Sequence, residues 1–250
     1  LGARGVRSFG VSAETTRRLS EVARSRHTTV NIVLQAAWAQ LLCWVTGHHD
    51  VAFGTTVSGR PADLVGAESM VGLLINTIPV RANVAAATTT ADLMDQLHGG
   101  YNDTLEHQHL ALSEIHRITG QDKLFDTLFA YENYPIDTAA LSGDHGLALT
   151  DATVREYNHY PLTMQAALSG DELGFRVEYD TDVFDAETID TLNVRMQRVL
   201  QAMTGDPGRP LSSVDLLDEP EHDRLNEIGN RSALTQPAPG PVSIPALFAE

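Results

Sequence analysis

The chain has 250 residues, a formal net charge of −16 at pH 7, and hydrophobic and charged fractions of 42% and 20%. This composition is typical of a globular protein, and so acidic a surface repels phosphate backbones, which excludes nucleic acid as the expected partner. No run of about 18 apolar residues occurs, so we predict no membrane-spanning helix. The single cysteine, Cys43, can form neither an internal disulfide nor a metal site by itself. We interpret it as a buried thiol rather than a nucleophile. The absence of a possible internal disulfide favours a cytoplasmic protein. Because the chain begins with Leu1 and no signal-peptide pattern follows, we expect a piece of a longer protein.

The first half of the chain predicts alternating strands and helices. Residues 6–12 have strand character, and Ser12 is placed to cap an amphipathic helix. The apolar run 30–47 predicts a buried helix that ends at Gly47. Two further strands are predicted, with Pro79 at an edge or bulge of the second, and two helices follow them. These four elements span residues 51–59, 73–84, 89–109 and 112–119.

The pattern changes to strands in the second half. Four strands are predicted, at residues 125–134, 147–157, 162–170 and 173–180, with a hairpin turn between the last two. Asp185 is placed to cap an amphipathic helix, and a short helix follows Glu219. From Gly229 the chain is rich in proline, as in a linker. The fold class predicted is α/β with a mixed or antiparallel sheet.

The motifs that point to a function lie in residues 54–81, "GTTVSGRPADLVGAESMVGLLINTIPVR". This block resembles the condensation domains of nonribosomal peptide synthetases. Their Ser-Gly-Arg, Glu-x-Met-Val-Gly and Ile-Asn-Thr-x-Pro-Val-Arg motifs correspond to residues 58–60, 68–72 and 75–81. Residues 124–135, 157–164 and 178–189 resemble later motifs of the family, in the right order. One departure is Ala111, where the family often has proline.

The resemblance implies a domain organisation. Family domains are about 450 residues long and have two lobes, each similar to chloramphenicol acetyltransferase. The motifs found here belong to the C-terminal lobe. We therefore expect residues 1–228 to form that lobe, and residues 229–250 to be the linker and the start of a following adenylation domain.

The stretch "GHHDVAFG", residues 47–54, nearly matches the His-His-x-x-x-Asp-Gly motif of acyl transfer, but Phe53 replaces the aspartate. One interpretation is a decayed active site. The other, which we favour, is an exposed polar turn before a strand, because His48 and His49 follow a helix-ending glycine and precede an aspartate. By resemblance, the true motif lies upstream in the N-terminal lobe, so no catalytic residue is assigned in this chain.

The resemblance assigns an inter-lobe or structural role to Arg60, Ser58 and Glu68. In the family the arginine of Ser-Gly-Arg pairs with the aspartate of the upstream motif, and a bidentate Arg–carboxylate pair suits such a contact. The alternative for Arg60 is a surface arginine at the end of a strand.

Four further residues are candidates for the wall of the tunnel between the lobes. Asn76 and Thr77 are polar residues in an apolar strand, where hydrogen bonding to the backbone is the favoured alternative. Asn133 could position a tetrahedral intermediate through its amide, or form a turn before Tyr134-Pro135. His159 lies in a segment that resembles one crossing between the lobes, for which a structural role is favoured.

No metal site is predicted. His107 and His109 are two residues apart, a poor spacing for one helix face, and His109 and His116 lack a completing carboxylate pair.

The function implied by the resemblance is amide-bond formation between an acyl or peptidyl donor and an aminoacyl acceptor, both tethered to peptidyl carrier proteins. No cofactor is expected to bind directly, but the carriers bring phosphopantetheine arms. The expected partners are the N-terminal lobe, the carriers and the following adenylation domain. Without the histidine motif the chain is expected to be inactive alone. The alternatives are a non-catalytic docking or recruitment lobe and, less favoured, an epimerising or cyclising domain.

Overall fold

The computed structural model describes residues 3–60, 64–132, 158–229 and 235. The chain divides into two compact units, Leu1–Val214 and Asp215–Glu250. In the second unit, α7 (Glu219–Ile228) begins at Asp218, whose carboxylate accepts from the Glu221 amide in a capping box. The short helix predicted after Glu219 is therefore confirmed. The domain boundary predicted at residue 228 remains a prediction.

The first unit is built on a six-stranded mixed sheet with the order β1-β6-β5-β4-β2-β3. Parallel pairing joins β5 to β4 and β4 to β2, and the other neighbours are antiparallel. The mixed sheet confirms the predicted fold class. The strands are β1 (Arg4–Val11), β2 (Asp50–Val57), β3 (Asn76–Asn83), β4 (Thr127–Glu132), β5 (Leu162–Ser169) and β6 (Glu172–Asp180).

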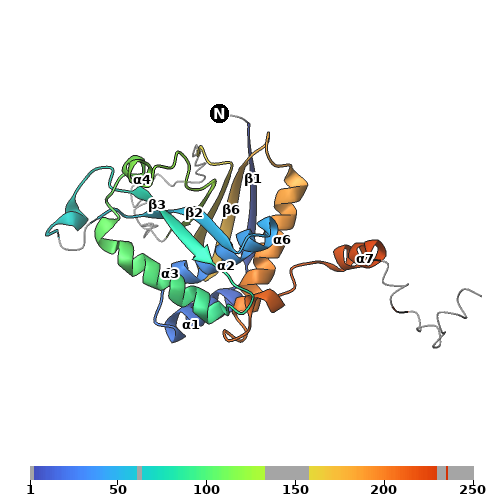
Figure 1. Ribbon diagram of the computed structural model, residues 1–250. Helices are drawn as coiled ribbons and strands as arrows, with labels where there is room; N and C mark the ends of the chain where they lie inside the picture. The colour runs from blue at the N-terminus through green and yellow to red at the C-terminus, as the bar shows by residue number, and fades with distance from the viewer. Residues whose placement is uncertain (1–2, 61–63, 133–157, 230–234, 236–250) are drawn as a thin grey trace, which may run out of the picture. The chain divides into compact units, whose positions relative to one another are not determined.

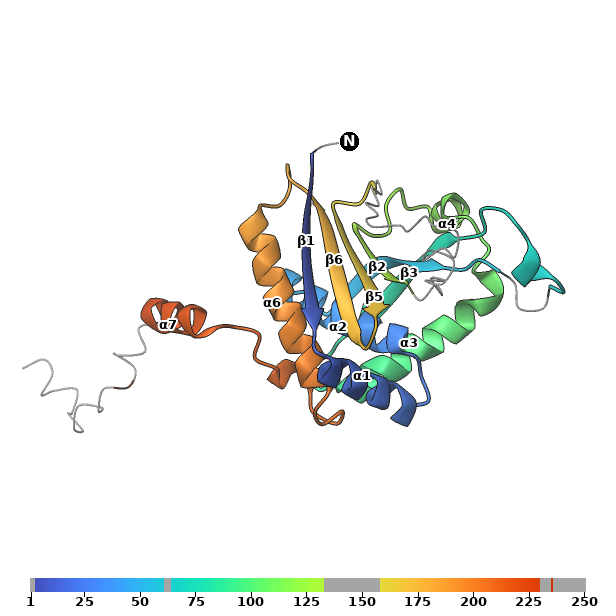
Figure 2. The same ribbon diagram turned by 180° about the vertical axis from the view of Figure 1, so that it is seen from behind.

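The helices α1 (Ala13–Ser25), α2 (Val30–Thr46), α3 (Thr90–Thr104) and α6 (Ala186–Met203) lie on one side of the sheet (Figures 1 and 2). The central helix is α2, which packs against α1, α3 and α6 as well as against β2 and β4. All twelve of its residues from Ile32 to Cys43 are buried. Among the described residues no single helix is long and apolar enough to cross a membrane; α1 and α2 pass that test only as a pair bent by 105°.

Local sequence signals account for most helix ends. The side chains of Ser12, Thr29 and Asp185 accept hydrogen bonds from the first turns of α1, α2 and α6. The buried helix α2 ends at Gly47, whose φ of 69° is the left-handed conformation that glycine adopts without strain. The predicted hairpin between β5 and β6 is also present, with Gly170 at a φ of 64°.

Three predicted boundaries are wrong or partly untested. The strand predicted to begin at residue 73 begins at Asn76. Asn76 pairs with Val57, the last residue of β2, so residues 73–75 lie beyond the end of the neighbouring strand. The helix predicted over residues 89–109 ends at Thr104 and is followed by a 3₁₀ turn, η2 (Leu105–His107). The strand predicted at residues 147–157 lies outside the described residues, as does most of the predicted linker. Helix α4 (Leu112–Thr119) has the predicted bounds, and Pro79 lies in β3, which is an edge strand as expected.

Candidate functional site: a pocket at the start of α2

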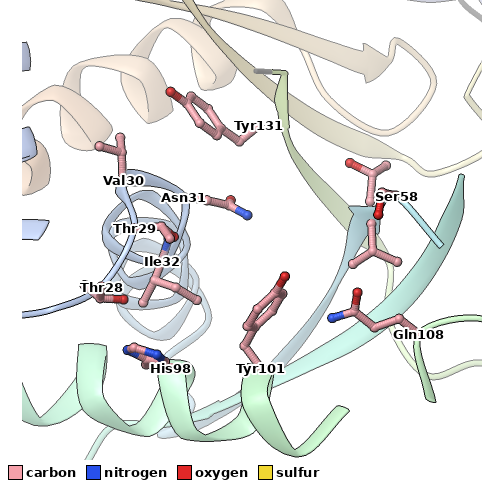
Figure 3. A pocket seen from close by; sticks show the side chains of 12 residues that line it. Thr28, Thr29, Val30, Asn31, Ile32, Ser58, His98, Tyr101, Gln108 and Tyr131 are labelled. Atoms are coloured by element: carbon pink, nitrogen blue, oxygen red, sulfur yellow. The ribbon is translucent and has the colours of Figure 1, made fainter. Parts of the chain in front are cut away.

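A pocket of about 350 Å³ lies where the start of α2 meets the end of β2 and the helix α3 (Figure 3). We call it the α2 pocket. Its size is at the lower end of the range for small-molecule sites. The described residues that line it are residues 28–32, residues 56–58, His98, Tyr101, Gln108 and Tyr131.

The sequence explains why polar groups gather at this position. Thr29 caps α2 by accepting a hydrogen bond from the Ile32 amide at 3.3 Å, so the first turn of the helix lies at the wall of the pocket. The first amides of a helix have no partner within the helix, and the helix dipole is positive at this end. Ser58 follows the last residue of β2, and His98 and Tyr101 are three residues apart on one face of α3.

Asn76, the first residue of β3, fixes the segment that carries Gln108. Its amide nitrogen donates to the carbonyl oxygens of Gln108 and Leu110, at 2.9 and 2.7 Å. These hydrogen bonds are the ones expected of a residue that satisfies backbone groups, and the role of Asn76 in a tunnel wall stays a prediction. Gln108 itself is only 8% exposed.

Within the part of the chain that the structure describes, two buried polar atoms of the pocket lining have no hydrogen-bond partner: Gln108 Nε2 and Thr28 Oγ1. In Figure 3 these residues lie on opposite sides of the pocket, with Tyr101 and Asn31 between them. Burial raises the pKa of the Tyr131 phenol, so this residue remains a neutral hydroxyl at physiological pH. No lysine, arginine, aspartate or glutamate is among the described lining residues. Apart from the imidazole of His98, the described lining therefore offers neutral hydrogen-bonding groups.

Ser58 and Arg60, both predicted from the Ser-Gly-Arg motif, lie at the start of the loop between β2 and β3. Ser58 lines the α2 pocket. The Arg60 guanidinium donates to the Ala67 carbonyl and, at 3.1 Å, to the Met70 carbonyl, so it braces its own loop. It pairs with no carboxylate among the described residues. Glu68 lies in the 3₁₀ turn η1 (Ala67–Ser69) of the same loop. The predicted inter-lobe roles remain predictions.

The other predicted tunnel residues do not gather at the pocket. Thr77 is half-buried on β3, next to Asn76 but not among the described lining residues. His159 is exposed and its ring lies 4.1 Å from that of Tyr160. Asn133 lies outside the described residues. For Thr77 and His159, as for Asn133, the role in a tunnel stays a prediction.

The histidines of the near-match to the acyl-transfer motif lie in an exposed turn before a strand. His48 and His49 are exposed between Gly47 and β2, whereas Phe53 is fully buried within β2. The favoured interpretation of this stretch is confirmed, and its histidines line no part of the α2 pocket. Cys43 is 9% exposed, which confirms the predicted buried thiol, and burial, with Asp50 nearby, raises the pKa of this thiol to about 11.

The sequence of the chain is similar to the sequences of known proteins over most of its length. Residues 4–226 match the family model of the condensation domain. The chain belongs to the condensation-domain family. The chain is 35% identical over 219 residues to surfactin synthase subunit 3 of Bacillus subtilis (strain 168), covering 87% of the chain and 17% of that protein. It is 32% identical over 235 residues to tyrocidine synthase 2 of Brevibacillus parabrevis, covering 92% and 6%.

Solved structures of a condensation domain and of an X-domain share the fold. The first condensation domain of the CDA synthetase aligns with a TM-score of 0.70 at 21% identity, over 86% of this chain and 48% of that chain. The X-domain from teicoplanin biosynthesis aligns with a TM-score of 0.72 at 22% identity, over 86% and 50%. The chain thus spans about half the length of these structures.

Most residues of the α2 pocket were not foreseen from the sequence. Gln108, Tyr101 and Tyr131 come from three separate elements, and no spacing in the sequence links them. The signals in the sequence were Ser58, which lines the pocket, and the polar pair Asn76-Thr77 within an apolar strand, of which Asn76 holds Gln108 in place.

Proposed function

We propose that this chain is the C-terminal lobe of a nonribosomal peptide synthetase condensation domain, with the beginning of the segment that leads to an adenylation domain. In the whole domain it supplies one wall of the site where an amide bond forms. The donor is an acyl or peptidyl thioester and the acceptor an aminoacyl thioester, each tethered through a phosphopantetheine arm to a carrier protein. The family match over residues 4–226 and the coverage of about half of the solved condensation-domain structures support this proposal.

The observation that carries the proposal is the exposed apolar loop between β2 and β3. Val65 and Leu73 are 96% and 92% exposed, Val71 is fully exposed, and Leu64, Met70 and Ile75 are about half exposed. Soluble proteins rarely leave so many large apolar side chains uncovered in one segment, and such a patch marks an interaction surface. We assign the N-terminal lobe as the element that covers it.

The second support is the chemistry of the chain itself. The two histidines of the near-match, His48 and His49, are exposed in the turn before β2, so they lie in no shaped pocket for a general base. A base for the acceptor amine would then come from the N-terminal lobe. This half of the domain would contribute by holding the tethered reactants in line, which is worth up to roughly 7–11 kcal/mol in favourable cases.

The test is peptide transfer between two loaded carrier proteins, followed by intact-protein mass spectrometry. One sample contains this chain alone, and another contains the natural protein extended upstream to the whole domain. The proposal expects transfer only by the extended protein, and loss of transfer when the upstream motif histidine is changed to alanine. Transfer by the chain alone would contradict it, and His48→Ala and His49→Ala would then be the next variants.

A recruitment lobe is the second candidate. The X-domain, one of whose solved structures is a complex with OxyB, has the same fold. A whole domain that binds carrier proteins but transfers nothing, with or without its upstream histidine, would favour this function.

A further inference from the structure

The α2 pocket has a chemistry of its own that the proposed function leaves unassigned. Gln108 Nε2 is a hydrogen-bond donor on a side chain that is more than nine-tenths buried, and it has no partner. Buried polar groups in proteins are nearly always hydrogen-bonded, so an exception in the wall of a cavity points to a ligand. The atom that Gln108 Nε2 would bind is an acceptor oxygen.

A second feature of the pocket points to the same kind of atom. The first turn of the seventeen-residue helix α2 lines the cavity; the Ile32 amide is taken by Thr29 Oγ1, which leaves the amides of Val30 and Asn31 without a partner within the helix. Together with the buried Gln108 amide, this helix end gives the pocket donors from two separate elements. Such an arrangement favours an oxygen with partial negative charge.

The rest of the lining argues against a fully charged ligand. The described lining residues include no lysine or arginine to pair with a carboxylate or phosphate, and the chain has a net charge of −16, which repels anions. The lining also holds acceptors, since Thr28 Oγ1 is buried without a partner on the opposite side from Gln108. A neutral group with both an oxygen acceptor and an N–H donor fits this lining best.

We propose that the α2 pocket binds secondary amides, with Gln108 Nε2 donating to the amide oxygen. This inference rests on the proposed function for the origin of its ligand. Two sources carry the same chemistry: the peptide backbone of a tethered substrate and the tether, which contains amide bonds. The volume of about 350 Å³ admits a ligand of one or two amide units.

The inference is tested by NMR titration of the ¹⁵N-labelled chain. The probes are N-acetylglycine N-methylamide, which represents a peptide, D-pantetheine, which represents the tether, and sodium acetate as the charged comparison. We expect the amides to shift the Gln108 side-chain resonance, which is identified by its absence in Gln108→Leu, with dissociation constants in the millimolar range. The tighter of the two amide probes identifies the source.

Two variants and one control make the result specific. Losing one neutral hydrogen bond weakens binding by about five- to tenfold, and this is the effect we expect for Gln108→Leu. Gln108→Glu keeps the shape but replaces the donor with an acceptor, and is expected to weaken binding at least as much. Gln121→Leu changes an exposed glutamine outside the pocket and is expected to bind like the wild type. If neither Gln108 variant folds, Thr28→Val provides the comparison.

The proposal is overturned if neither amide binds, if acetate binds as tightly as the amides, or if changing the pocket residues leaves affinity unchanged. Its failure is separate from that of the proposed function. If the whole domain transfers peptide but this chain binds no amide, only the proposed ligand of the α2 pocket is wrong. If this chain binds amides but the whole domain transfers no peptide, only the proposed role in peptide-bond formation is wrong.

Discussion

Replacing Asn76 tests how the segment that bears Gln108 is held. The Asn76 amide donates two hydrogen bonds to that segment, at 2.9 and 2.7 Å from the carbonyl oxygens. Each is worth about 0.5–1.5 kcal/mol net, so Asn76→Leu should lower the free energy of unfolding by about 1–3 kcal/mol. For a unit of this size about 2 kcal/mol corresponds to a fall in Tm of roughly 4–8 °C.

Asn76→Asp separates hydrogen bonding from packing. The aspartate has nearly the same shape, but when ionised it points acceptors at two carbonyl oxygens, so we expect it to be more destabilising than Asn76→Leu at pH 7. Because ionisation is disfavoured in the folded state, the carboxyl pKa should be raised above its unfolded value of about 3.9. The added cost is then absent below that unfolded pKa and grows as the pH rises through the folded pKa.

The assay is urea unfolding of each variant between pH 3.5 and 7.5, with the difference from wild type taken at each pH. Asn102→Leu, at an exposed position on α3, is the control and should lie within about 0.5 kcal/mol of wild type. The reasoning would be refuted if Asn76→Leu were as stable as this control, or if the cost of Asn76→Asp did not grow with pH.

Three further predictions concern the core and the loop. Cys43, with a thiol pKa of about 11 against an ordinary 9.0, should react with a disulfide reagent at pH 8 about 100-fold more slowly in the folded chain than in 8 M urea; equal rates would contradict its burial. Glu178, 4% exposed on β6, lies 3.3 Å from the Arg176 guanidinium and 4.0 Å from that of Arg4, so Glu178→Ala should destabilise by about 3–5 kcal/mol in thermal unfolding and Glu178→Gln by less. Gly59→Ala should lower the free energy of unfolding by more than about 2 kcal/mol, because φ is +61° and a Cβ there would overlap the Leu74 carbonyl oxygen. Gly47 has a similar φ of +69° but open space around it, so Gly47→Ala should lower that free energy by only about 1–2 kcal/mol. Equal losses for the two variants in denaturant unfolding would show that the overlap is unimportant.

Elements governed by neighbouring residues were predictable from the sequence. The caps at Ser12 and Asp185 and the left-handed Gly47 are local signals, and each marks a real helix end. Ends that depend on tertiary contacts were not predictable. Leu73 and Ile75 continue the apolar run into β3, yet they pair with no strand because β2 is already complete at Val57.

The α2 pocket illustrates the same limit for function. The family motif led to Ser58, which does line the pocket, and to Asn76, which supports it. Gln108, the residue on which the further inference depends, lies in a segment predicted as regular helix. Its position becomes apparent only when the hydrogen bonds from Asn76 fix the turn after α3.

Complementation of peptide transfer shows most directly whether this chain forms one half of the site of amide-bond formation. The preceding half of the natural protein and this chain are produced separately, mixed with one donor-loaded and one acceptor-loaded carrier protein, and followed by intact-protein mass spectrometry. The account predicts that neither half transfers alone, that the mixture does, and that replacing exposed Val71 and Leu73 by serine lowers transfer by the mixture without unfolding the chain. Transfer by this chain alone would contradict the assignment of this chain as a supporting lobe. So would transfer by the preceding half alone at the same rate as by the mixture.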